Sequence, residues 1–200
     1  MSEVKTFGHD TTYSGLSWAI QLLGEHQKVQ EKVFEEMERI FGASKRAPTK
    51  EDLQDMKYLE CVIKETLRLY PSAPSIGRRA NSDIQIGKYT IPAGISVWIQ
   101  IFFIHRKPEY FPNPEEFDPD NFLPERVRER HPYAYLPFSA GPRSCLGRKY
   151  AITEMKTLLS YLVRSFKFRS VNKTKDLPPV FGLTLTVHGG VHIELKRRST

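Results

Sequence analysis

One cysteine lies on a turn rich in glycine and proline, directly before a segment with helical periodicity. Cys145 stands in the run Pro137-Phe138-Ser139-Ala140-Gly141-Pro142-Arg143-Ser144-Cys145-Leu146-Gly147. Apolar residues then recur at helical spacing from Leu146 to about Val163. A helix N-terminus and a nearby cation both stabilise a thiolate over a thiol. A thiolate on such a constrained turn serves as a nucleophile, a redox centre or a metal ligand.

Three other interpretations compete for this run: a buried structural cysteine, a disulfide partner and a phosphate-binding loop. The phosphate-loop interpretation fails, because Gly141 and Gly147 enclose five residues and are followed by Arg148-Lys149 instead of Lys-Ser or Lys-Thr. The second of the two cysteines, Cys61, lies among apolar residues at helical spacing, and we expect it in the core. Two such cysteines form no disulfide framework, so we expect a reducing compartment.

The bulk composition is that of a soluble globular chain. With 200 residues, 40% hydrophobic and 26% charged, the chain can bury one substantial core. Its net charge of +7 would attract an anionic partner. The basic residues are scattered, however, and we expect most of them on solvent-exposed faces. No apolar run approaches the roughly 18 residues that span a bilayer. The cations near Cys145 are the best placed to receive an acidic electron donor; they are Arg143, Arg148 and Lys149.

Hydrophobic periodicity predicts mainly helices. We expect them over residues 10–23, from Gly24 to Gly42, over 55–70 and over 146–163. Alternating residues predict a hairpin over 84–91, a strand over 95–101 and a closing hairpin over 183–195 around Gly189-Gly190. In that last hairpin, His188 and His192 are expected as ordinary side chains and not as metal ligands. Residues 106–137 read as a proline-rich irregular segment, held down by Phe111, Phe117 and Phe122. The fold class is mainly α with small antiparallel β-sheets.

Three motifs, taken together and in order, resemble one family. The spacing Phe-x-x-Gly-x-Arg-x-Cys-x-Gly around Cys145 resembles the haem-ligand loop of the cytochrome P450 monooxygenases. The Glu65-x-x-Arg68 helix and the run Gly8-His9-Asp10-Thr11-Thr12 resemble two further motifs of that family. The last run, together with His131-Pro132-Tyr133-Ala134-Tyr135, looks most like family four, the fatty-acid omega-hydroxylases. Residues 1–200 would then form a single partial domain, the C-terminal portion of the cytochrome P450 fold without its N-terminal half.

The resemblance implies a role for each matched residue. Cys145 would ligate the iron of haem b, and Arg143 would contact a haem propionate. The rest of the cofactor loop would comprise Phe138, Gly141 and Gly147. Glu65 and Arg68, joined by Arg126, would form a charged structural triad that holds the cysteine loop in place.

Further residues would lie over the haem. Asp10 and Thr11 would relay protons, and a substrate pocket would be lined by Ser75, Ile76, Phe181 and Leu183. Phe7 precedes Gly8 directly, where family-four members usually carry more residues, so we expect an altered pocket shape there.

The implied activity is hydroxylation of a hydrophobic substrate, a fatty acid or other lipid. O2 and electrons from NADPH would enter through a cytochrome reductase, with cytochrome b5 as a further partner. The implied location is the cytoplasmic face of the endoplasmic reticulum membrane, with membrane association only in a full-length form, and no nucleic acid is expected. Two alternatives stay open: an inactive truncated isoform that binds only haem or reductase, and a basic interaction module.

Overall fold

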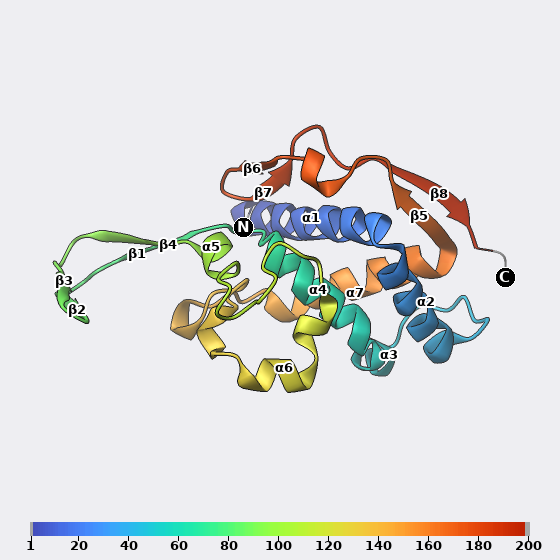
Figure 1. Cartoon of the computed structure of the whole chain (residues 1–200), viewed down its shortest axis with the longest axis horizontal. Helices are drawn as coiled ribbons and strands as arrows, with labels where there is room; N and C mark the ends of the chain where they lie inside the picture. Colours follow the sequence, from blue (N-terminus) through green and yellow to red (C-terminus); the bar gives the residue numbers. More distant parts are fainter. Residues whose placement is uncertain (1, 199–200) are drawn as a thin grey trace.

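Four helices build the body of the protein. The computed structural model describes the backbone of residues 2–198 and the side chains of residues 8–198. The long helix α1 (Ser2–Glu25) crosses the centre of Figure 1, and α2 (Gln27–Phe41), α4 (Lys57–Leu69) and α7 (Arg148–Ser165) pack around it. Small antiparallel two-stranded sheets flank this body, which confirms the expected fold class. Among the described residues, no helix is both long and apolar enough to cross a membrane.

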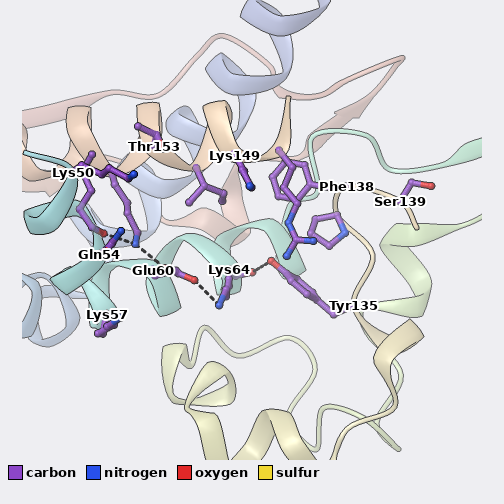
Figure 2. A pocket seen from close by; sticks show the side chains of 15 residues that line it. Lys50, Gln54, Lys57, Glu60, Lys64, Tyr135, Phe138, Ser139, Lys149 and Thr153 are labelled. Carbon is purple, nitrogen blue, oxygen red and sulfur yellow. Dashed lines mark hydrogen bonds and ion pairs between the residues drawn. The ribbon is translucent and has the colours of Figure 1, made fainter. Parts of the chain in front are cut away.

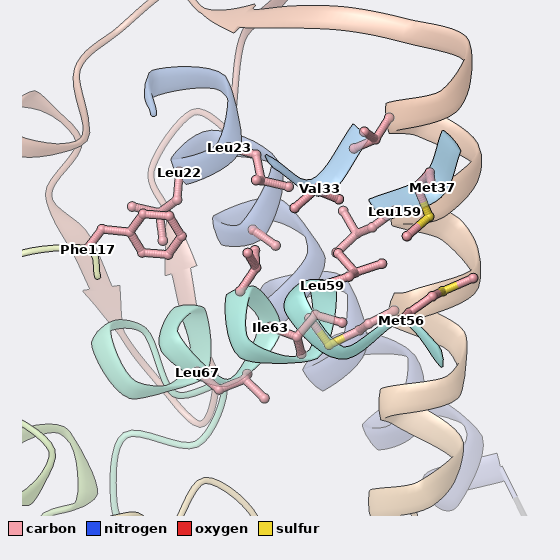
Figure 3. Packing of buried hydrophobic residues seen from close by; sticks show 14 of the residues in the cluster. Leu22, Leu23, Val33, Met37, Met56, Leu59, Ile63, Leu67, Phe117 and Leu159 are labelled. Carbon is pink, nitrogen blue, oxygen red and sulfur yellow. The ribbon is translucent and has the colours of Figure 1, made fainter. Parts of the chain in front are cut away.

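The core lies where these four helices meet. Figure 3 shows side chains from α1, α2, α4 and α7 converging on one buried cluster. Its fully or almost fully buried members include Leu22, Leu23, Val33, Met37, Met56, Leu59, Ile63 and Leu159. Helices α2 and α7 each bury one apolar stripe, as their 3.6-residue periodicity predicts, whereas α1 over 18–24 and α4 over 65–69 are buried on almost every side. The predicted core position of Cys61 is confirmed, and burial raises the pKa of its thiol to about 11.

The predicted helix over 55–70 is confirmed as α4 (Lys57–Leu69), but the sequence analysis missed a short helix before it. A short helix α3 (Lys50–Asp55) precedes α4, and Met56 separates them. Thr49 and Asp52 form a capping box that starts α3. The carboxylate of Glu36 accepts hydrogen bonds from the amides of Tyr58 and Leu59 at the start of α4. The capping pattern at Thr49 was visible in the sequence, whereas the long-range cap from α2 was not.

A β-sheet arm extends from the helical body. Strand β1 (Ile76–Arg79) pairs with β4 (Ser96–Ile99), and the predicted hairpin is confirmed as β2 (Ile84–Ile86) with β3 (Tyr89–Ile91). In Figure 1 this arm projects away from the helices. The strand expected over 95–101 ends at Ile99, because the chain turns into the short helix α5 (Ile101–Ile104). Buried Ile101 joins the core there, which overrides the strand-like alternation.

The closing hairpin predicted over 183–195 is wrong in its pairing. Strand β7 (Leu185–Val187) pairs with β6 (Pro179–Phe181), and β8 (Ile193–Arg197) pairs with β5 (Phe166–Ser170). Gly189 and Gly190 do form a turn with positive φ, but it joins two different sheets. Alternation shows that a strand has two faces and does not identify its partner. His188 and His192 therefore flank a crossover instead of facing each other across one hairpin.

Close approach of backbone explains one glycine in α1. A Cβ on Gly24 would lie 2.7 Å from the backbone nitrogen of Ser170 in β5, which leaves no room for a side chain. The β5–β8 sheet is thereby seated directly on α1. The irregular segment after α5 contains only short helical turns and is held down by Phe111, Phe117 and Phe122, as expected. Those turns are η1 (Pro119–Phe122), α6 (Pro124–Glu129) and η2 (Pro132–Ala134).

Candidate functional site

Cys145 lies on the surface, three residues before Arg148, the first residue of α7. It is a free cysteine, and its amide donates a hydrogen bond of 2.9 Å to the carbonyl oxygen of Phe138. A Cβ on Gly147 would lie 3.8 Å from the Sγ of Cys145, so the sulfur sits beside the N-cap residue of α7. The structural-cysteine and disulfide interpretations therefore do not describe this thiol. It is presented at a helix N-terminus, which favours negative charge.

The backbone of the loop is fixed by residues with unusual conformations. Gly141 has φ +75°, which only glycine adopts without strain, and it begins the turn η3 (Gly141–Arg143). Ser139 also has a positive φ, and its hydroxyl accepts a hydrogen bond from Arg78 in β1. Phe138 packs against the main core, so the loop is anchored to the helical body at its first residues.

The two residues before the loop tie it to α4 and to His105, the residue that follows α5. The hydroxyl of Tyr135 donates to the carbonyl oxygen of Lys64, and the amide of Leu136 donates to Nε2 of His105 at 2.7 Å. His105 and Arg78 were absent from the sequence-based site. Neither residue belongs to a recognisable sequence motif. Their importance comes from distant contacts, because His105 bonds to a residue 31 positions away and Arg78 to one 61 positions away.

Glu65 and Arg68 form a buried pair, as the helix spacing predicts. Both side chains are 0% exposed, and Arg68 donates two hydrogen bonds of 2.8 Å to the two carboxylate oxygens of Glu65. Arg68 also donates to the carbonyl oxygens of His105, Pro114 and Glu116. Burial raises the pKa of the Glu65 carboxyl, and the Arg68 guanidinium opposes this shift. The pair thus holds α4 against the irregular segment that leads to the cysteine loop.

Arg126 does not join this pair directly, which corrects the predicted triad. Its guanidinium pairs with Asp118 and donates to the amide oxygen of Asn121. Asn121 is the residue that reaches Glu65, with its Nδ2 3.3 Å from Oε1. Arg126 is half exposed, so water already solvates its charge and a buried carboxylate is not required. The sequence motif favoured the charged Arg126 as the partner of Glu65, but the buried side-chain amide of Asn121 makes that contact.

Asp10 and Thr11 lie on the first half of α1. The carboxylate of Asp10 is 3.1 Å from Nδ1 of His9 at the surface, and the Thr11 hydroxyl donates to the carbonyl oxygen of Gly8. Ser72, after α4, donates to the carbonyl oxygen of Thr11 and so fixes this part of α1. The predicted effect of Phe7 concerns a side chain outside the described ones.

The predicted substrate-lining residues come from segments that lie next to each other. Ile76 is the first residue of β1 and Ser75 directly precedes it, and the carbonyl of Pro74 accepts a hydrogen bond from the amide of Phe102. The ring of Phe102 contacts that of Phe181 edge-on, with centroids 5.0 Å apart. Phe181 and Leu183 are both exposed. Phe102 therefore links the segment before β1 with Phe181, although the two segments are more than 100 residues apart in the sequence.

A cationic groove of about 630 Å³ borders the cysteine loop. Figure 2 shows it between α4, α7 and the segment that contains Tyr135 and Phe138. Its acidic residue, Glu60, is neutralised by Lys64 and Lys156 at 2.7 and 2.6 Å. Partial burial opposes ionisation of Glu60, but these two ammonium groups lower its pKa to about 2. The further cations that line the groove are Lys50, Lys57, Arg148 and Lys149.

The donor set around Cys145 fits a haem. Among the described side chains, there is no cluster of three or more His, Cys, Asp or Glu residues that could hold a bare metal ion. An exposed lone thiol suits a macrocycle that brings the other iron ligands itself. Arg143, on the turn before Cys145, supplies a cation for a carboxylate of such a group.

Comparisons with known proteins agree with this chemistry. The cytochrome P450 family model matches residues 2–192. Cytochrome P450 4c21 of Blattella germanica is 52% identical over 179 residues, covering 88% of this chain and 36% of that protein. Cytochrome P450 4V2 of Homo sapiens is 48% identical over 200 residues, covering 98% of this chain and 38% of that protein.

A solved structure extends the agreement to the fold. The crystal structure of the cytochrome P450DA heme domain superposes with a TM-score of 0.87 and 31% identity, over 96% of this chain and 42% of that one. The chain thus spans less than half the length of the proteins that it matches. With the Cys145 loop, the buried Glu65–Arg68 pair and a family match over nearly every residue, the chain belongs to the cytochrome P450 family, and its relatives place it near family four.

Proposed function

We propose that this chain is the haem-thiolate portion of a monooxygenase that hydroxylates a hydrophobic substrate, a fatty acid or another lipid. The observation that carries the proposal is the exposed Cys145 thiol, on a loop anchored to the core and directly before α7. Family membership and the haem-domain neighbour imply haem iron at this loop, and we take the cofactor to be haem b. When bound, the haem supplies the activation of O2, for which the electrons come from NADPH through a reductase.

The residues of the loop hold the cofactor. The thiolate of Cys145 binds the iron, and the guanidinium of Arg143 pairs with a propionate. Gly141 and Gly147 keep side chains away from the two ends of the turn that presents the thiol. Phe138 anchors the loop through its contact with the core. These contacts fix the thiolate and exclude water from the packed side of the loop.

Asp10 and Thr11 move protons in this proposal. Asp10 lies at the surface, where its carboxylate exchanges protons with water, and Thr11 is the next residue on α1. A carboxylate beside a hydroxyl is a suitable pair for relaying protons from solvent to a buried centre. Ser75, Ile76, Phe181 and Leu183 orient the apolar chain of the substrate, since their side chains are apolar or small.

Product formation tests the proposal. The 200-residue protein is loaded with haem, mixed with reductase, NADPH and a saturated fatty acid, and assayed for hydroxylated product by mass spectrometry. Hydroxylated product that depends on NADPH supports the monooxygenase. Haem binding without any product favours the alternative of an inactive form that binds haem or reductase only.

The cationic groove is the proposed docking site for the electron donor, with cytochrome b5 as a second donor at the endoplasmic reticulum membrane. Pro137, Phe138 and Ser139 of the cysteine loop form one wall of the groove, so an acidic partner seated there lies close to the thiolate. With Glu60 already neutralised, the remaining lysines attract carboxylates of the partner. Complementary charge raises the rate of encounter and fixes orientation.

Charge reversal in the groove is expected to weaken reductase binding. Lys57 and Lys149 are exposed groove residues, and each exposed charge pair contributes roughly 0.2–1 kcal/mol. The double variant Lys57→Glu/Lys149→Glu should therefore bind reductase roughly tenfold more weakly at low salt, with a smaller salt dependence. Lys173→Glu/Lys175→Glu, beside and within the distant turn η4 (Thr174–Asp176), makes the same charge change as a control. Equal losses in both variants would refute docking at the groove.

A further inference from the structure

His105 is a buried polar residue that no step of the proposed function uses. It follows α5 and is 0% exposed. Its Nε2 lies 2.7 Å from the amide nitrogen of Leu136, and its Nδ1 lies 3.2 Å from the carbonyl oxygen of Arg68. One imidazole therefore links the end of α4 with the residue that lies two positions before Phe138 of the cysteine loop.

The two contacts fix the tautomer of the ring. A backbone amide is only a donor, so Nε2 must accept the hydrogen bond from Leu136. Nδ1 then carries the proton and donates it to the carbonyl oxygen of Arg68. A second proton on Nε2 would face the Leu136 N–H donor to donor and break this bond.

The surroundings keep the imidazole neutral. Burial is the largest cause that lowers the pKa of His105, to about 3, and the neighbouring cations Arg68 and Arg106 act in the same direction. Arg68 is paired with Glu65, and Arg106 with Glu115. The ring of Tyr135 stacks on the imidazole with centroids 5.1 Å apart. The acceptor at Nε2 is thus present at all physiological pH values.

We propose that His105 is a positioning residue for the Cys145 loop: by accepting the Leu136 amide proton and donating to the Arg68 carbonyl, it fixes the start of the loop against α4. Arg68 also donates to the carbonyl oxygen of His105, so the Glu65–Arg68 pair holds the residue that holds the loop. Downstream, the Ser139 amide bonds to the Leu136 carbonyl, and the Cys145 amide bonds to the Phe138 carbonyl. A continuous series of hydrogen bonds and short chain segments therefore runs from the buried ion pair to the thiol-bearing residue.

Three substitutions of His105 separate this role from simple packing. They differ in whether they retain the ring contact with Tyr135 and which of the two hydrogen bonds they retain. His105→Phe keeps a ring against Tyr135 and removes both hydrogen bonds. His105→Asn places a donor near the Nδ1 position and leaves Leu136 without an acceptor. His105→Gln reaches the Nε2 position with an amide oxygen, so it restores the acceptor. His26→Phe is the control, because His26 is a second histidine against an aromatic ring, that of Phe117, but is only partly buried and lies outside the contacts of Leu136.

Hydrogen exchange of the Leu136 amide in the haem-free protein is the direct test. Because a buried N–H without a partner costs about 1–3 kcal/mol, exchange should be roughly 5- to 150-fold faster in His105→Phe and His105→Asn than in wild type. His105→Gln and His26→Phe should exchange at nearly the wild-type rate. Nitrogen chemical shifts of the imidazole should show a protonated Nδ1 and an unprotonated Nε2. Equal exchange in the Asn and Gln variants, or a protonated Nε2, would overturn the proposal.

The role toward the haem rests on the proposed function and has its own readout. In haem-loaded, reduced protein with carbon monoxide, His105→Phe and His105→Asn should lose a larger share of the red-shifted thiolate band than His105→Gln. A larger thiolate band in His105→Gln than in His105→Asn is a rescue that a packing role does not produce. A smaller band in His105→Gln, or equal bands in the two variants, contradicts the positioning role. If the variants show the expected pattern of amide exchange but wild type never shows the thiolate band, the haem proposal fails while the positioning role stands.

Discussion

Cys145→Ser is expected to abolish the strongly red-shifted Soret band of the reduced, carbon monoxide-bound haem protein. That band requires a thiolate on the iron, which donates electron density that an alcohol does not supply. Serine retains the amide that bonds to Phe138, so the loop itself should keep its conformation. The measurement is a difference spectrum before and after addition of carbon monoxide, with circular dichroism to show that the variant is folded.

Cys61 provides the matched control for this experiment. It is the second cysteine of the chain, but it is buried and its Sγ lies 3.4 Å from the carbonyl oxygen of Phe122. Cys61→Ser should leave the position of the thiolate band unchanged. A band that persists in Cys145→Ser would disprove ligation by Cys145, and a band lost equally in both variants would point to unfolding.

Local chemistry made the helical body predictable from the sequence. Helix α2 begins after Gly24 and ends before Gly42, and α7 follows the cysteine loop, because amphipathic periodicity and glycine stops are encoded within each segment. The hairpin of β2 and β3 around Gly87-Lys88 is equally local. The exposed thiol, the loop before α7 and the Glu65–Arg68 spacing belong to the same group. Contiguous residues carry all of these features.

Features that depend on distant contacts were not predictable in this way. Residues 183–195 alternate as strands do, but their pairing depends on distant packing: β5, the partner of β8, lies on α1 where Gly24 leaves room for the backbone of Ser170, and β7 also contacts α1. Asn121 displaces Arg126 from Glu65 because a buried position favours a neutral amide over a second charge. His105 has no motif at all, and only its contacts with Arg68 and Leu136 reveal it.

Glu65→Ala is expected to destabilise the protein by about 3–5 kcal/mol, because it leaves the guanidinium of Arg68 buried without its carboxylate. The native state of a domain is stable by only about 5–15 kcal/mol, so this loss is large. The backbone amide of Asp118 and the side-chain amide of Asn121 also lose their common acceptor, Oε1 of Glu65, in this variant. The free energy of unfolding in urea, followed by circular dichroism, measures the effect.

The exposed pair of Arg169 and Glu194 supplies a control with the same residue types. Their side chains are 69% and 61% exposed, so Glu194→Ala should cost less than about 1 kcal/mol. If Glu65→Ala costs no more than this control, the buried pair does not hold α4 to the irregular segment.

Removing both charges should not restore stability here, although buried ion pairs in general tolerate apolar replacement. In Glu65→Leu/Arg68→Met no charge is left unpaired, but the carbonyl oxygens of His105, Pro114 and Glu116 lose the donor that satisfies them. Each buried carbonyl without a partner costs about 1–3 kcal/mol. The double variant should therefore remain well below wild type in unfolding free energy. Wild-type stability in that variant would mean that Arg68 acts only as the counterion of Glu65, and not as the link between α4 and the segment that leads to Cys145.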